Sequence, residues 1–289
     1  MTFPDSCTFI SDEVSQDLPE LVRFVREFGL PGIEVRSMFG RAFKDLTPAD
    51  VAEIRRVARG EGWRIFGCAS PVFKCDLDDD GAVAGGIEQF RRSVDIAREL
   101  DCDLVRVFTF LRRPAGLAGL LPRVVDRLRR LRELAERSGV RIGIENEHSC
   151  IVGSGDEARA LFALLPEPEF GLVWDPCNIL YIPELTGEVT APFADLSRRT
   201  FHLHVKDAVR ATPMLAAPVG LGDVGWRAHL AAIRRSGYRG MLSLETHWRI
   251  IPIAEEKLHA PGGYSFSHGG EPASRTCLHN LRELLLYGN

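Results

Sequence analysis

The chain has 289 residues, of which 45% are hydrophobic and 26% are charged, and its formal net charge is −4. This composition is typical of a globular protein with a sizeable core and excludes a disordered or collagen-like chain. The charge is small and no basic blocks occur, and no apolar run approaches the roughly 20 residues that span a bilayer. We therefore expect neither a nucleic acid nor a membrane as a partner.

The N-terminal sequence MTFPDSCTFISDEVSQD is acidic and lacks the charged and apolar segments of a secretory leader. The chain has seven cysteines. An odd number without a CxxC pair is typical of reduced thiols rather than of a disulfide framework. Both features predict a cytoplasmic protein.

Short β-type runs alternate with helical segments along the chain. Several runs are almost wholly apolar, as expected of strands that are buried on both faces of a parallel sheet. The predicted strands are Cys7–Ile10, Gly32–Arg36, Arg64–Ala69, Leu104–Phe108, Arg141–Glu145, Phe170–Trp174, Phe201–Val205 and Met241–Glu245.

Amphipathic periodicity fills the segments between these strands. Apolar residues recur three or four positions apart, and capping residues precede several of the segments. The predicted helices include Leu18–Phe28, one that begins at Thr47-Pro48, one over Leu121–Leu134 that stops at Gly139, one opened by Ser154 and Glu157, one over Trp226–Ile233 and a final one over Ser274–Leu286.

This alternation predicts an α/β protein with a single (β/α)8 TIM-barrel domain over residues 1–289. A doubly wound sheet is the alternative, but it commonly has a glycine-rich turn after its first strand, and Cys7–Asp12 contains none. The least regular stretch, 252–275, follows the eighth strand and is rich in Gly, His and Ser. Loops at this end of a barrel border the substrate, so we predict a lid or a homo-oligomer contact.

Ionisable side chains lie at the carboxyl ends of four consecutive predicted strands, at the end of the barrel where active sites lie. They are Glu145, Asp175, His204 and Glu245. Each pair of carboxylates ~4 Å apart repels by ~4 kcal/mol at an effective dielectric constant of about 20, so protons or a cation must compensate. This oxygen-rich set predicts one divalent metal ion, Mn²⁺ or Mg²⁺, with Zn²⁺ or Co²⁺ as alternatives. Separate salt-bridge or capping roles are the other interpretation.

Further polar residues on the strands are candidates for the same site. His202 lies on the same side of its strand as His204, either as its partner or as a core histidine, and Lys206 continues this alternation to the rim. An arginine inside a barrel requires a carboxylate or a ligand oxyanion. We predict that Glu34, Arg106 and His202 bind substrate and that Lys206 acts in catalysis. A structural ion pair of Arg106 and a solvated Lys206 are the alternatives.

Short motifs in a defined order cover essentially the whole chain. They are ISDEVS at 10–15, GIEVR at 32–36, IGIENEH at 142–148, WDPCN at 174–178, HLHVKD at 202–207, GLGDVGW at 220–226 and SLETH at 243–247. Together they resemble the sugar phosphate isomerase/epimerase family of xylose isomerase-like TIM barrels.

The resemblance implies one divalent metal ion, commonly Mn²⁺, with the ligands Glu145, Asp175, His204 and Glu245. It implies that the two glutamates also act as acid and base on opposite faces of the substrate. It further implies that Arg210, six residues after His204, contacts the substrate.

The sequence departs from two branches of this family. The ketose epimerases have a histidine three residues after the metal-binding aspartate, where this chain has Asn178. The DNA-repair endonucleases need further histidine ligands on the third and fourth strands, and Arg64–Ala69 and Leu104–Phe108 contain none. A DNA-repair site with three zinc ions is therefore disfavoured.

The sequence thus predicts a divalent-metal-dependent isomerase or epimerase that acts on a small sugar or keto-polyol through a metal-stabilised enediolate. Glu145 or Glu245 would remove a proton and the other would return it, while Lys206 and Arg106 polarise substrate oxygens. The alternative is a dehydratase or lyase that expels a β-substituent from a keto-inositol, keto-glycoside or dehydroshikimate-like substrate. A sugar-binding barrel without catalysis is a third hypothesis.

Overall fold

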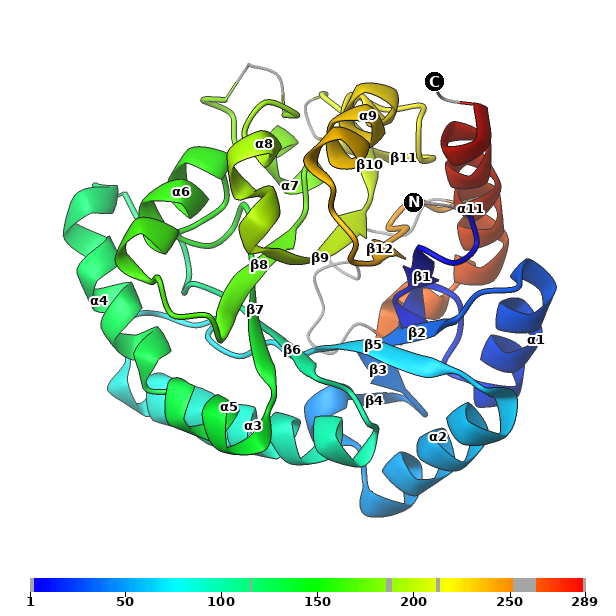
Figure 1. Cartoon of the computed structure of the whole chain (residues 1–289), viewed down its shortest axis with the longest axis horizontal. Coiled ribbons are helices and arrows are strands. Elements are labelled where there is room, and N and C mark those ends of the chain that lie inside the picture. Colours follow the sequence, from blue (N-terminus) through cyan, green and yellow to red (C-terminus); the bar gives the residue numbers. More distant parts are fainter. Residues whose placement is uncertain (1–2, 115, 186–188, 212–213, 252–263, 288–289) are drawn as a thin grey trace.

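The computed structural model describes residues 3–114, 116–185, 189–211, 214–251 and 264–287. Eight parallel strands form a barrel surrounded by helices, as predicted (Figure 1). They are β1 (Cys7–Phe9), β2 (Gly32–Val35), β5 (Arg64–Ala69), β6 (Leu104–Val107), β7 (Arg141–Glu145), β8 (Phe170–Trp174), β9 (Thr200–Val205) and β12 (Leu242–Leu244). Their order in the sheet is β1-β12-β9-β8-β7-β6-β5-β2.

The barrel closes between β1 and β2 through few backbone contacts. Ile10 forms an isolated parallel bridge with Glu34, and Thr8 Oγ1 donates a hydrogen bond of 2.9 Å to the carbonyl of Gly32. Gly32 has a φ of +152°, and a Cβ at this position would lie 1.8 Å from the carbonyl oxygen of Arg64. Only glycine therefore fits at the start of β2, where the strand lies against β5.

The helices cover the outside of the barrel (Figure 1). They are α1 (Leu18–Phe28), α2 (Pro48–Glu61), α3 (Asp80–Glu99), α4 (Leu117–Arg129), α5 (Arg132–Ser138), α6 (Gly155–Leu164), α7 (Cys177–Leu180), α8 (Phe193–Leu196), α9 (Trp226–Ser236) and α11 (Gly270–Tyr287). The predicted starts at Thr47 and Ser154 are confirmed, because each residue forms a complete capping box.

The single helix predicted over Leu121–Leu134 is wrong, because the segment divides into α4 and α5. At the break, the backbone N–H groups of Arg130 and Leu131 donate to carbonyls three residues earlier. Leu131 is nevertheless fully buried. The apolar spacing continues across the break, so the periodicity contains no sign of it.

The segment after β12 is only partly described. Residues 252–263 of the predicted loop 252–275 lie outside the described part of the chain. The remainder forms a 3-10 helix, η4 (Tyr264–Ser267), and the beginning of α11. The final helix thus begins at Gly270, before the predicted Ser274, and a Cβ at Gly270 would lie 2.3 Å from the carbonyl oxygen of Glu13. Its start is therefore pressed against the segment that follows β1.

Two short hairpins also occur among the described residues: β3 (Ser37–Met38) with β4 (Arg41–Ala42), and β10 (Asp207–Val209) with β11 (Leu215–Ala217). In the described part of the chain, no helix combines the length and apolarity needed to cross a membrane.

Candidate metal centre

The four side chains predicted as metal ligands converge at the carboxyl ends of the barrel strands. Each offers one ligand atom, and these atoms all lie within 4.8 Å of one another in a buried group that we call the acid cluster: Glu145, Asp175, His204 and Glu245. The strands that supply them, β7, β8, β9 and β12, are neighbours in the sheet. The register of β8 against β9 shifts between Leu172 and Val173, and such a bulge re-aims the residues that follow it.

Two cations of the protein lie against the acids. Lys206 Nζ is 2.9 Å from both Asp175 Oδ2 and Glu245 Oε2. Arg106 Nη1 donates to Glu145 Oε2 over 2.7 Å. These contacts offset part of the repulsion among the carboxylates.

Two buried atoms of the acid cluster lack hydrogen bonds. Asp175 Oδ1 accepts from the backbone N–H groups of Cys177 and Asn178 at 2.8 and 3.2 Å, and His204 Nε2 lies 3.2 Å from Glu34 Oε1. Asp175 Oδ2 lies 2.9 Å from Lys206 Nζ and His204 Nδ1 lies 3.4 Å from Glu145 Oε1, but neither contact has the geometry of a hydrogen bond. Buried polar atoms seldom lack hydrogen bonds, and a histidine held by a carboxylate on one nitrogen is typical of metal sites. The residues therefore fit a divalent cation.

The surroundings raise the pKa values of Asp175 and His204. Burial and the glutamates of the cluster together raise the pKa of Asp175 to about 7, against the opposing effect of the ammonium of Lys206. Burial alone would lower the pKa of His204, but the carboxylates of Glu34 and Glu145 raise it well above its usual value. Both groups thus respond to the negative charge around them.

The two glutamates of the cluster behave in the opposite way. Burial opposes their ionisation, but the guanidinium of Arg106 lowers the pKa of Glu145, and the ammonium of Lys206 holds the pKa of Glu245 well below its usual value. Both side chains are consequently carboxylates at neutral pH and can accept a proton.

A second charged group, which the sequence reasoning missed, lies beside Glu245. Arg36 donates to Glu245 Oε1 over 2.6 Å and to Glu13 Oε1 over 2.7 Å. His247 Nε2 lies 3.3 Å from Glu245 Oε1, and its ring stacks on Phe266 with centroids 4.4 Å apart. Except for Phe266, these residues belong to the motifs at 10–15, 32–36 and 243–247. Their contacts depend on barrel closure, which no single motif encodes.

Glu34 and His202 lie on the other side of His204, in the barrel interior. Glu34 Oε2 is 3.0 Å from His202 Nε2 and accepts from Ser243 Oγ over 2.6 Å. Glu34 is 1% exposed and His202 is 2% exposed. Their binding of substrate remains a prediction, and their present partners are each other, His204 and Ser243.

Two positions singled out by the family resemblance lie in different surroundings. Asn178 Nδ2 donates to Glu145 Oε1 over 3.4 Å, and its Oδ1 accepts from Lys206 Nζ over 3.2 Å. Asn178 therefore links the acid cluster to its lysine. Arg210 is not brought to the cluster, because its guanidinium donates to the carbonyl of Leu185 over 2.6 Å.

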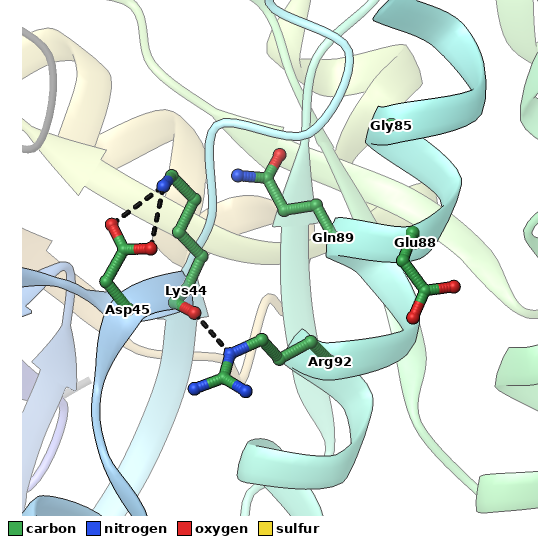
Figure 2. Close-up of a pocket in the computed structure, with 6 residues that line it drawn as sticks. All are labelled: Lys44, Asp45, Gly85, Glu88, Gln89 and Arg92. Carbon is green, nitrogen blue, oxygen red and sulfur yellow. Dashed lines mark hydrogen bonds and ion pairs between the residues drawn. The ribbon is translucent and has the colours of Figure 1, made fainter.

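Two cavities lie apart from the acid cluster. One, of about 450 Å³, lies between η2 (Phe43–Asp45) and α3 (Figure 2) and is lined by Lys44, Asp45, Gly85, Glu88, Gln89 and Arg92. There Lys44 pairs with Asp45, and Arg92 donates to the carbonyl of Lys44. The other, of about 760 Å³, lies where the strands begin, and Arg64 and Arg141 are among its lining residues. Neither cavity contains a member of the acid cluster.

The sequence of the chain is similar to those of known proteins. A sequence model of the xylose isomerase-like TIM barrel family matches residues 22–264. Two curated 3-dehydroshikimate dehydratases, from Pseudomonas aeruginosa and Pseudomonas putida, are 30% and 26% identical over 250 and 253 residues, or 80% of this chain in each case. The chain spans only 36% of the length of each relative.

Solved structures share the fold at low identity. The IolI protein with a bound zinc atom has a TM-score of 0.76 and 18% identity, with 97% of this chain and 98% of that chain covered. D-allulose 3-epimerase from Methylomonas sp. in complex with D-allulose has a TM-score of 0.69 and 17% identity, with 98% and 99% covered. A xylose isomerase-like TIM barrel protein from Mycobacterium smegmatis in complex with magnesium has a TM-score of 0.67 and 16% identity, with 98% of both chains covered.

Proposed function

The chain belongs to the xylose isomerase-like TIM barrel family, and we propose that it is a metal-dependent enzyme that moves a proton on a carbon next to a carbonyl group. The substrate class is a small sugar or keto-polyol. The observation that carries this proposal is the acid cluster, in which two ionised glutamates lie beside a buried aspartate and histidine whose ligand atoms Oδ2 and Nδ1 form no hydrogen bond within the described residues.

Glu145, Asp175, His204 and Glu245 would hold one divalent ion. When bound, the ion would polarise the substrate carbonyl and offset the negative charge that develops on its oxygen. Three carboxylates with one imidazole favour Mn²⁺ or Mg²⁺, and Zn²⁺ or Co²⁺ also suit this set. The zinc and magnesium in the similar structures support a divalent ion but do not select one.

The sheet order supports opposite positions for the acid and the base. Glu145 ends β7 and Glu245 follows β12, and β8 and β9 lie between these strands. A substrate between the two carboxylates can lose a proton to one and regain it from the other. Lys206, beside Glu245, would donate a hydrogen bond to a substrate oxygen. This arrangement supports isomerisation or epimerisation as the first candidate.

Dehydration is the second candidate, because the curated relatives at 30% and 26% identity are 3-dehydroshikimate dehydratases. Glu145 or Glu245 would remove a proton as in the first candidate reaction. A hydroxyl group on the next carbon would then receive a proton and leave as water. Arg106, paired with Glu145, would bind an oxyanion of the substrate in either reaction.

Solvent exchange tests the proposal. The Mn²⁺-loaded protein is incubated in D₂O with ketoses, keto-inositols and dehydroshikimate, and products are followed by NMR and mass spectrometry. We expect deuterium at the carbon next to the carbonyl, with the stereochemistry or the loss of water identifying the outcome. A Glu245→Gln variant should slow exchange by about 10²-fold or more. The absence of exchange and of product with every compound would refute the proposal.

A further inference from the structure

The carboxylate of Glu34 is held at the centre of the barrel by three donors. Its Oε1 lies 3.2 Å from His204 Nε2. Its Oε2 lies 3.0 Å from His202 Nε2 and accepts from Ser243 Oγ over 2.6 Å. Around the closed barrel β1 and β12 lie between β2 and β9, so this side chain reaches its histidines through the interior rather than along the sheet.

The fold makes room for this carboxylate in two ways. The register of β2 against β5 shifts between Ile33 and Glu34, because β5 carries one extra residue, Phe66, between Ile65 and Gly67. This bulge brings Gly67 rather than a larger residue opposite Glu34. On β5, a Cβ at Gly67 would lie 3.3 Å from Glu34 Cγ and 3.4 Å from Glu34 Oε1. A larger residue at position 67 would therefore press on the carboxylate.

The contact with Glu34 also places a proton on Nε2 of His204. A carboxylate can only accept, so the Nε2 atom that faces Glu34 must be the donor. In a neutral imidazole the other nitrogen then has the free electron pair. That nitrogen, Nδ1, lies 3.4 Å from Glu145 Oε1 and 3.8 Å from Glu245 Oε2.

We propose that Glu34 is a positioning residue of the metal centre, which holds Nε2–H of His204 and so presents Nδ1 to the acid cluster. His202 and Ser243 in turn fix the orientation of the Glu34 carboxylate. This inference rests on the proposed metal-dependent function and adds a role to a residue that need not touch substrate.

Two other roles for Glu34 make different predictions. As a substrate contact, Glu34 would change KM without changing metal affinity. As a ligand of a second ion with His202 and His204, whose ligand atoms also lie within 4.8 Å of one another, it would give two ions per chain. The contacts of Glu34 with His202 and His204 already use the carboxylate oxygens and the Nε2 atoms that such an ion would need.

The test is Mn²⁺ binding to the full chain by calorimetry. We expect one ion per chain in the wild type and about 10- to 100-fold weaker binding in Glu34→Gln. The amide keeps the size of the side chain, but only one of its two terminal atoms accepts hydrogen bonds. An unchanged affinity in Glu34→Gln, or two ions per wild-type chain, would overturn the inference. A wild type that binds no ion would instead refute the proposed function.

A second variant and a control keep this test decisive. Ser243→Ala leaves Glu34 in place but removes one donor, and it should weaken Mn²⁺ binding several-fold. If Glu34→Gln does not fold, unchanged binding in Ser243→Ala overturns the inference. Glu53→Gln alters an exposed carboxylate of α2 that pairs with Arg56, and its Mn²⁺ affinity should equal that of the wild type.

Nitrogen NMR of the histidines gives a readout that does not depend on affinity. In the protein loaded with Zn²⁺, His204 should show a protonated Nε2 and a metal-bound Nδ1. Metal bound through Nε2 would contradict the proposed role of Glu34.

Discussion

At the centre of the barrel, each charged residue is placed either by the end of its own strand or by contacts across the barrel seam. The four members of the acid cluster are predictable because each lies at the end of a strand or directly after it, and parallel strands bring their carboxyl ends together. The pairing of Arg36 with Glu245 is not, because it joins residues 209 positions apart across the barrel seam. His247 is also unpredictable, since its φ of +47° places it in a turn without periodicity.

Lys206 provides a prediction at this scale. Its ammonium lies between Asp175 and Glu245 at 2.9 Å from each. In Lys206→Met the two buried carboxylates lose this cation, and the free energy of unfolding without divalent ions should fall by about 3 kcal/mol. Mn²⁺ should restore more stability in this variant than in the wild type, because it replaces the missing positive charge.

Urea unfolding with and without Mn²⁺ measures both effects. Lys44→Met is the matched control, since Lys44 pairs with Asp45 at the surface and such pairs contribute about 1 kcal/mol or less. Equal stability of Lys206→Met and the wild type without metal would contradict the expected balance of charge.

Individual strands and helices were predictable to different degrees. The eight strands agree with the predicted ranges to within one residue at each end, because apolar runs and their polar ends mark parallel strands clearly. The break between α4 and α5 left no trace in the apolar spacing. The start of α11 depends on close contact between Gly270 and Glu13, which is a tertiary feature.

The packing of α9 on β8 predicts a pH dependence. His229 of α9 is fully buried, and its Nε2 accepts from Trp174 Nε1 over 2.9 Å. Burial lowers the pKa of His229 from 6.5 to about 3. Below about pH 6.5 the unfolded state therefore binds a proton that the folded state does not, so this histidine destabilises the fold as pH falls toward about 3.

Comparison with His229→Gln isolates this effect. From about pH 7 to about pH 5, the free energy of unfolding of the wild type should fall by about 2 kcal/mol more than that of the variant. Urea unfolding at several pH values gives the two slopes. Parallel slopes would show that His229 does not contribute in this way.

For the whole molecule, the net charge of −4 predicts less about ion binding than the positions of the charged groups do. Three carboxylates meet at one end of the barrel, so a bound divalent ion should stabilise the folded chain. At a free Mn²⁺ concentration of about 100 times Kd, the expected gain is about 2.7 kcal/mol, which corresponds to several degrees in Tm. Thermal unfolding should show this rise in the wild type and a much smaller one in Asp175→Asn. Equal rises would place the ion elsewhere.

The central claim is that the acid cluster holds one divalent ion. Anomalous X-ray diffraction from crystals soaked in Mn²⁺ tests it most directly. We predict a single strong peak bounded by Glu145, Asp175, His204 and Glu245. The claim would be contradicted if no peak appeared there. It would also be contradicted if the ion lay instead between Glu13 and His247, which offer further ligand atoms beside Glu245.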